Sequence, residues 1–162
     1  MQPWSDVNVP ALTLPPVVFH VFDSKSDELK SLPSSRSAKL YVCGITPYDA
    51  THMGHAATYV AFDTLNRFWQ AIGVEVQYAQ NITDIDDPLL ERAKLTDRAW
   101  EDIAAEQIDL FKADMVALRV LPPQNYIGVV ESMELIEQSA VKLQELGVAY
   151  SVENDLYFDM TH

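Results

Sequence analysis

The sequence is poor in cysteine, with one in 162 residues, and it has no long uninterrupted apolar run. The single thiol, Cys43, excludes an internal disulfide and favours a reducing compartment, so we expect a cytoplasmic protein. Apolar runs of roughly 18 to 20 residues span a bilayer, and no run here approaches that length. Residues 1–16 have neither a basic start nor a continuous apolar stretch, which predicts no export signal and no membrane segment.

Basic residues are also scarce, because 11 Lys and Arg stand against 24 Asp and Glu and give a formal charge of -13. A polyanion gains nothing from counterion release when it meets another polyanion, so nucleic acid is a poor partner for this chain alone. The composition, with 48% hydrophobic and 22% charged residues, is that of an average globular protein. A chain of this length predicts about one domain, with a core of its own.

The distribution of proline divides the chain. Residues 1–38 hold five of the nine prolines and one dense apolar stretch at Val17–Phe22. This composition predicts an extended lead-in with one short strand. The remainder, residues 39–162, ends at His162 without a capping or stop signal, so we expect the chain to be part of a longer protein.

The pattern in the middle of the chain predicts a strand, a helix and a second strand. Leu40–Cys43 is a compact apolar run that suits a strand buried on both faces. Apolar residues then recur at helical spacing over residues 52–72, with Gly73 at the expected C-terminal cap. Residues 74–83 predict the second strand. Because such units cross over in a parallel, right-handed sense, the predicted class is α/β, with a parallel sheet and flanking helices.

Further helices are predicted downstream. Asp87 and Pro88 are typical of the N-cap and first residue of a short helix. A long helix is predicted over residues 100–118, and apolar residues at helical spacing over 129–143 predict an amphipathic helix. Residues 149–160 resemble a hairpin.

The densest group of reactive side chains lies in residues 43–56, Cys-Gly-Ile-Thr-Pro-Tyr-Asp-Ala-Thr-His-Met-Gly-His-Ala, where a predicted strand ends and a helix begins. A helix N-terminus offers unpaired N–H groups and a partial positive charge, both suited to phosphate. His52 and His55 lie three residues apart, so both imidazoles can donate to a phosphate in a transition state. Gly54 would let a base or ribose approach the backbone. On spacing alone, a surface pair or a loose metal contact is the alternative.

A second polar segment, Asn81–Asp87, follows the second predicted strand. Asn and Thr side chains there can hydrogen-bond the ammonium and carboxyl groups of an amino acid. Asp87 is expected to cap a helix, and for Asp84 and Asp86 capping and a role in binding stay equally open. A calcium site is disfavoured, because no further carboxylates follow at the required spacing.

Cys43, taken alone, is typical of a small buried hydrophobe.

Both segments resemble motifs of class I aminoacyl-tRNA synthetases, and more narrowly of their cysteinyl branch. The resemblance rests on these residues: Cys43, Gly44, Thr46, Tyr48, Asp49, residues 52–56, residues 81–87 and residues 91–93. It implies a Rossmann-like (HUP) class I aminoacyl-tRNA synthetase catalytic domain, of which residues 39–162 would be the first, incomplete part. The resemblance extends over nearly the whole chain.

Details within the motifs are closer to the mycothiol cysteine ligases, a related family. They are Ile45, Pro47, Ala50, Thr51, residues 56–59, Pro88, residues 117–123 and residues 1–4. This resemblance implies ATP-dependent ligation of L-cysteine to glucosaminyl-inositol through cysteinyl-adenylate. One alternative is a cysteinyl-tRNA synthetase, with the same first step and tRNA as acceptor. The other is a nucleotide-binding fragment without activity, because the family's Lys-rich loop is missing from this chain.

The resemblance also implies a role for each matched residue. His52 and His55 would be catalytic, and Cys43 would ligate one zinc ion whose other ligands lie outside this chain. Thiolate binds zinc strongly, so such an ion could select cysteine over serine. The expected contacts to cysteine or its adenylate are Cys43, Gly44, Ile45, Thr46, Gly54, Thr58, Asn81, Ile82 and Thr83. The expected partners are L-cysteine, ATP and glucosaminyl-inositol, with no nucleic acid and no membrane, and a monomer is expected.

Overall fold

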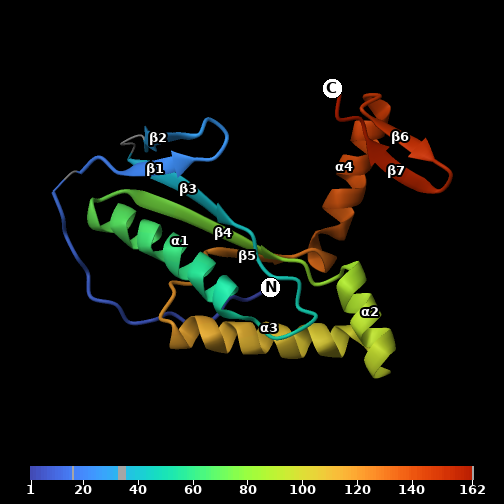
Figure 1. Cartoon of the computed structure of the whole chain (residues 1–162), viewed down its shortest axis with the longest axis horizontal. Coiled ribbons are helices and arrows are strands. Elements are labelled where there is room, and N and C mark those ends of the chain that lie inside the picture. The colour runs from blue at the N-terminus through green and yellow to red at the C-terminus, as the bar shows by residue number, and fades with distance from the viewer. Residues whose placement is uncertain (16, 33–35, 162) are drawn as a thin grey trace.

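The computed structural model describes residues 1–15, 17–32 and 36–161 (Figure 1). The predicted chain end at His162 lies outside these residues. The elements in chain order are β1 (His20–Asp23), β2 (Glu28–Ser31), β3 (Ser37–Val42), α1 (Met53–Ala71), β4 (Glu75–Ile82), α2 (Asp87–Thr96), α3 (Trp100–Ala117), β5 (Asn125–Gly128), the 3-10 turn η1 (Val130–Ser132), α4 (Met133–Glu145), β6 (Ala149–Val152) and β7 (Asp155–Phe158).

The central sheet has the order β3-β4-β5 and is parallel throughout. Leu40 of β3 lies opposite Tyr78 of β4, and Gln80 of β4 lies opposite Tyr126 of β5. The parallel crossover from β3 through α1 to β4 is confirmed. The third strand, β5, is not predicted by the sequence pattern, because it has only four residues and a single large ring on its buried side.

Helix α1 has the boundaries that its sequence predicts. It begins after the N-cap His52 and ends at the C-cap Ile72, and Gly73 follows with a φ of 82°, in the left-handed region that favours glycine. At its middle, Asp63 accepts a hydrogen bond from the Leu121 amide at 2.9 Å and so joins α1 to the segment before β5. Across the described ranges, the helices are all too short or too polar to cross a membrane.

One face of the central sheet carries the main core. Side chains of β3, β4 and β5 pack there against α1 and α3, and the Tyr59 ring of α1 meets the Phe111 ring of α3 at 5.0 Å. The expectation that Leu40–Cys43 is buried on both faces is wrong: Leu40 and Val42 are buried, but Tyr41 is 62% exposed and Cys43 is exposed. The cause is that α1 and α3 both contribute to this one core, so the alternate side chains of β3 have no layer above them in the described part of the chain.

The N-terminal lead-in differs from its prediction in two ways. It forms a two-stranded antiparallel hairpin, β1-β2, where a single strand is expected. It also supplies Trp4 to the main core, where the indole is 4% exposed and donates to the Val120 carbonyl at 2.8 Å. The rings of Phe111 and Tyr126 lie edge-on to it at 5.8 and 5.9 Å. The division of the chain at residue 38 stays a prediction.

Residues 129–161, which we call the C-terminal arm, project from the sheet (Figure 1). The predicted hairpin is confirmed as β6-β7, with Tyr150 stacked on Tyr157. The predicted helix is present as η1 and α4, but its apolar face is not covered: among its described residues none is buried, and Ile136 is 44% exposed. We call residues 37–128, from β3 to β5, the packed region.

Candidate active site

A cavity of about 320 Å³ lies where β3 ends and α1 begins. It is lined by Gly44, Ile45, Thr46, Tyr48, Asp49, Ala50, Thr51, His52 and His55. The carboxyl ends of parallel strands are the edge at which open α/β sheets bind ligands. The structure thus brings both histidines and three of the predicted substrate contacts, Gly44, Ile45 and Thr46, to one cavity.

The two histidines cap α1. The His52 Nδ1 accepts a hydrogen bond from the Gly54 amide at 3.0 Å, and the His55 Nδ1 accepts one from the His52 amide at 3.2 Å. This reciprocal pair is a capping box in which imidazoles replace the usual hydroxyl and carboxamide. The rings lie 4.1 Å apart, centroid to centroid, and 33° from parallel. The spacing of three residues thus places the two imidazoles side by side.

The capping box also fixes where each histidine holds its proton. Because each Nδ1 accepts a backbone N–H, a neutral ring carries its hydrogen on Nε2. Burial lowers the pKa of His55 from its ordinary value of 6.5, and the adjacent His52 lowers that pKa further. The His55 ring is therefore neutral at pH 7, and its Nε2–H remains as a donor that the capping box does not use. Beside the unpaired amides of the first turn of α1, such donors suit an oxyanion.

Gly54 and Thr58 serve the start of α1 in this structure. A Cβ on Gly54 would lie 2.8 Å from the His52 Cε1, so a larger residue would displace the capping imidazole. Thr58 is exposed, and its hydroxyl donates to the Gly54 carbonyl at 3.1 Å. Neither residue lines the cavity. Their predicted contacts with the adenylate stay predictions.

Gly44 and Asn81 join the ends of β3 and β4. A Cβ on Gly44 would lie 1.6 Å from the Asn81 carbonyl oxygen, a separation that no side chain can occupy. The Asn81 Oδ1 accepts the Gly44 amide at 2.9 Å and the Tyr41 hydroxyl at 3.0 Å. The Asn81 side chain, predicted to contact substrate, is thus already engaged in holding the turn after β3.

The remaining predicted contacts divide into buried and accessible groups. The side chains of Ile45 and Ile82 are 3% and 0% exposed and belong to the main core, so they offer a ligand only their backbone. The side chains of Thr46 and Thr83 are half-buried, so their hydroxyl groups are the polar groups that these two residues could offer a ligand. The Thr83 amide donates to the Ile45 carbonyl at 3.0 Å, which brings the two predicted segments side by side.

Cys43 is exposed rather than a buried hydrophobe, and its carbonyl accepts the Tyr59 hydroxyl at 3.1 Å. Burial raises the pKa of Tyr59, which keeps this donor protonated. The residues that the structure describes contain no cluster of three or more His, Cys, Asp or Glu side chains able to hold a metal ion. A zinc site needs at least three protein ligands, so the residues present here do not by themselves fit zinc.

Of the acidic residues after β4, Asp86 has the capping role that the sequence predicts for Asp87 and leaves open for Asp86 itself. The N-cap of α2 is Asp86, whose carboxylate accepts the Asp87 amide at 2.9 Å, so the assignment of Asp87 as the cap is wrong by one residue. Pro88 tolerates either of the first two helical positions, so it could not fix the cap. Asp84 is 9% exposed and accepts the Val130 amide at 3.0 Å, which ties the end of β4 to the segment after β5.

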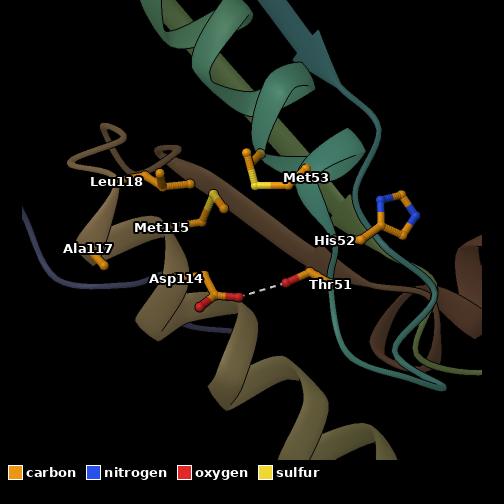
Figure 2. Close-up of a pocket in the computed structure, with 8 residues that line it drawn as sticks. Thr51, His52, Met53, Asp114, Met115, Ala117 and Leu118 are labelled. Atoms are coloured by element: carbon orange, nitrogen blue, oxygen red, sulfur yellow. Dashed lines mark hydrogen bonds between the residues drawn. The ribbon is translucent and has the colours of Figure 1, made fainter.

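A contact that the sequence did not predict lies beside the cavity (Figure 2). The Thr51 hydroxyl donates to the Asp114 carboxylate of α3 at 2.6 Å. Both residues line a second cavity of about 360 Å³, which also includes His52. No sequence signal could have paired these residues, because they are 63 positions apart and only the approach of α3 to α1 joins them.

Comparison with known proteins finds several ligases of one name, L-cysteine:1D-myo-inositol 2-amino-2-deoxy-alpha-D-glucopyranoside ligase. The protein of Kribbella flavida is 52% identical over 160 residues, which are 98% of this chain and 39% of that protein. That of Saccharopolyspora erythraea is 50% identical over 160 residues, 99% of this chain and 39% of that protein. That of Acidothermus cellulolyticus is 51% identical over 158 residues, again 98% and 39%. The chain thus spans well under half the length of these relatives.

Among solved structures, a LeuRS from Agrobacterium radiobacter K84, in a ternary complex with tRNA and LeuAMS, matches with a TM-score of 0.61 and 22% identity. The match covers 73% of this chain and 16% of that one, and it supports the α/β fold with its parallel sheet. The profile of the family described as tRNA synthetases class I (C) catalytic domain matches residues 30–162. With that match over most of its length, the chain belongs to the class I (C) tRNA synthetase catalytic domain family.

Proposed function

We infer that the protein containing this chain is a ligase that joins L-cysteine to glucosaminyl-inositol at the expense of ATP. The single observation that carries the proposal is the cavity at the end of β3, which both capping histidines of α1 line. The identity of about half of all positions to ligases of that name supports the choice of substrates.

The first step is activation of cysteine. Its carboxylate oxygen attacks the α-phosphate of ATP, the bond to the bridging oxygen breaks, and pyrophosphate leaves. Negative charge grows on the α-phosphate oxygens during this step. The Nε2–H groups of His52 and His55, together with the first amides of α1, would stabilise that charge. Removing one such donor in other enzymes costs about 10²- to 10³-fold in rate.

The second step transfers the cysteinyl group. The amine of glucosaminyl-inositol attacks the activated carbonyl, AMP leaves with the C–O bond electrons, and the amine loses a proton as the amide forms. The products are the cysteinyl amide and AMP. Besides the histidine pair, the carboxylate of Asp49 lines the cavity, and we assign no acceptor of that proton.

Recognition of cysteine and its adenylate is proposed for the residues around the cavity. Thr46 and Thr83 are half-buried, and their hydroxyls make long hydrogen bonds of 3.5 Å, to Asp86 and Asn81. Gly44 and Ile45 would contribute backbone groups. Cys43, Gly54, Thr58, Asn81 and Ile82 complete the proposed contacts. Asn81 would act largely by holding Gly44.

A zinc ion remains part of the proposal, with Cys43 as one ligand, as the resemblance of its motif to the cysteinyl branch implies. Its remaining ligands would have to come from outside this chain. When bound, such an ion would recognise the sulfur of cysteine. Neither step above is routed through it. The protein is further proposed to be a cytoplasmic monomer whose partners are small molecules.

A cysteinyl-tRNA synthetase is the second candidate, because the matched family profile is that of a tRNA synthetase domain. It would share the activation step and differ in the acceptor. The formal charge of -13 weighs against a nucleic-acid partner for this part of the protein.

Product analysis of the complete gene product tests the proposal. With ATP and cysteine, we expect cysteine-dependent exchange of labelled pyrophosphate into ATP. On addition of glucosaminyl-inositol, we expect its cysteinyl amide and one AMP per amide. Charging of tRNA with cysteine and no amide would replace the ligase by the synthetase. The 162-residue chain alone is expected to show no exchange, since it spans 39% of its relatives.

A further inference from the structure

The first residues of the loop between β3 and α1 are hydrogen-bonded to α1, β4 and the start of α2, whereas its second half, residues 47–52, has fewer links. Of its residues, Thr51 directly precedes the N-cap His52, and its hydroxyl donates to the Asp114 carboxylate at 2.6 Å. The other hydrogen bonds of residues 47–52 that we find in the described ranges are local, such as the Ala50 amide to the Asp49 carboxylate. The Thr51–Asp114 contact is therefore the side-chain link from this half of the loop to α3.

Figure 2 shows how this link lies relative to the histidine. Thr51 and Asp114 face one another across the gap between the start of α1 and α3, and the His52 imidazole points away from them. Asp114 therefore does not touch the imidazole. Its effect on His52 has to pass through the backbone of Thr51, whose carbonyl carbon is bonded to the His52 nitrogen.

That nitrogen is the donor on which the capping box depends. The His52 amide is held by the His55 Nδ1 at 3.2 Å, a long hydrogen bond that a small rotation of the peptide would break. A shift of the Thr51–His52 peptide would thus turn both rings. Misplacement of reacting groups by about 1 Å can cost about 10²-fold in rate.

We propose that Asp114 is a positioning residue for the histidine pair, acting through the Thr51 hydroxyl to fix the direction of both imidazoles. The proposal rests on the function inferred above. It gives α3, which contributes no side chain to the cavity at the end of β3, a role in the chemistry there. Loss of the link is expected to lower kcat about 10- to 100-fold and to leave the KM for ATP nearly unchanged, because binding groups remain in place while the donors lose their direction.

The experiment uses the complete gene product and three substitutions. Thr51→Val removes the hydroxyl and keeps the shape, Thr51→Ser keeps the hydroxyl, and Asp114→Ala removes the acceptor. We expect Thr51→Val and Asp114→Ala to show the same fall in kcat, the double variant to be no worse than either, and Thr51→Ser to retain activity. Thr64→Val is the matched control, since that hydroxyl donates at 2.8 Å to the Val60 carbonyl of its own helix.

The outcomes separate this inference from the proposed function. If the wild-type protein shows no cysteine-dependent pyrophosphate exchange, the proposed function fails. If the wild type is active and Thr51→Val retains the kcat of Thr64→Val, the positioning role is overturned. Should Thr51→Val not fold, Asp114→Ala decides, and an undiminished kcat in that variant overturns the role. A loss of activity in Thr51→Ser as large as in Thr51→Val would assign the effect to packing of the methyl group and would equally overturn it.

Discussion

The packed region and the C-terminal arm both have helices with apolar side chains at helical spacing, but the environments of these side chains are opposite. In the packed region, the Phe111 side chain of α3 is 0% exposed, whereas the Leu135 side chain of α4 is 67% exposed. Helix α1 and helix α3 each bury residues, and α4 buries none. An amphipathic pattern therefore predicts that a helix has a face to bury, but it does not predict what covers that face.

The same difference applies to chemistry. Every proposed site residue, from Cys43 to Thr83, lies in the packed region, and the arm lines neither the cavity at the end of β3 nor the one beside it. The geometry of the histidine pair is thus set by the region with a core. Substitutions in the arm are expected to leave that geometry unchanged.

The largest contrast is expected in stability. Phe111→Ala should reduce the free energy of unfolding of the packed region by about 3 to 5 kcal/mol, because it opens a cavity in the main core. Leu135→Ala, its counterpart in the arm, should change it by less than about 0.5 kcal/mol, since the side chain is exposed. Equilibrium unfolding in urea measures both. A large loss in Leu135→Ala would show that the arm is packed in solution.

Activity provides the second contrast. His52→Ala and His55→Ala should each lower cysteine-dependent pyrophosphate exchange in the complete gene product by about 10²- to 10³-fold, because each removes a donor to the developing charge. His20→Ala, in the exposed hairpin of the lead-in, is the control and should exchange normally. Exchange at the control rate in either test variant would remove that histidine from the mechanism.

Glycine substitutions provide the third contrast. Gly44→Ala should destabilise the packed region by about 3 kcal/mol, because its methyl group meets backbone that cannot move aside. Gly147→Ala, in the arm, should cost about 1 kcal/mol, because its φ of 73° is strained for alanine but nothing lies within 4 Å. Thermal unfolding of the two variants compares them. Equal losses would contradict the close approach of β3 and β4.

The smallest expected effect concerns pH. The folded protein lowers the pKa of His55 from 6.5, so folding favours the neutral ring. The stability that this contributes is present in full above about pH 6.5 and is lost as the pH falls through the lowered, folded-state pKa. His55→Gln keeps an acceptor for the capping box without titrating. Between pH 7 and pH 5, its unfolding midpoint should therefore fall less than that of the wild type, and an identical fall would count against the effect.

The β3-α1-β4 unit and the histidine motif could be predicted because their signals are local. Each of these signals lies within a short stretch of sequence: the helical spacing of apolar residues, the C-terminal Gly73, and the histidine motif around Gly54. Strand β5 could not be predicted, since four residues carry too little pattern and its place is set by pairing with β4. The exposure of Tyr41 depends on which side of the sheet α1 and α3 occupy. The residues near Tyr41 in the sequence do not indicate that side.

The site shows the same limit. That His52 and His55 would lie together follows from their spacing, but the cap at Asp86 rather than Asp87 depends on an extended backbone, with φ of -167° and ψ of 160°. The links from Tyr59 to Cys43 and from Thr51 to Asp114 join distant elements. Tyr59 follows His55 by four residues on the buried side of α1, so a search along that side would have found it.

The position of Trp4 in the core has a consequence for spectroscopy. The chain has three tryptophans, Trp4, Trp69 and Trp100, and none lies in the C-terminal arm. Tryptophan emission will therefore follow unfolding outside the arm, while far-ultraviolet circular dichroism also records α4. A difference between the two unfolding midpoints would be a direct, label-free measure of how independently the arm melts.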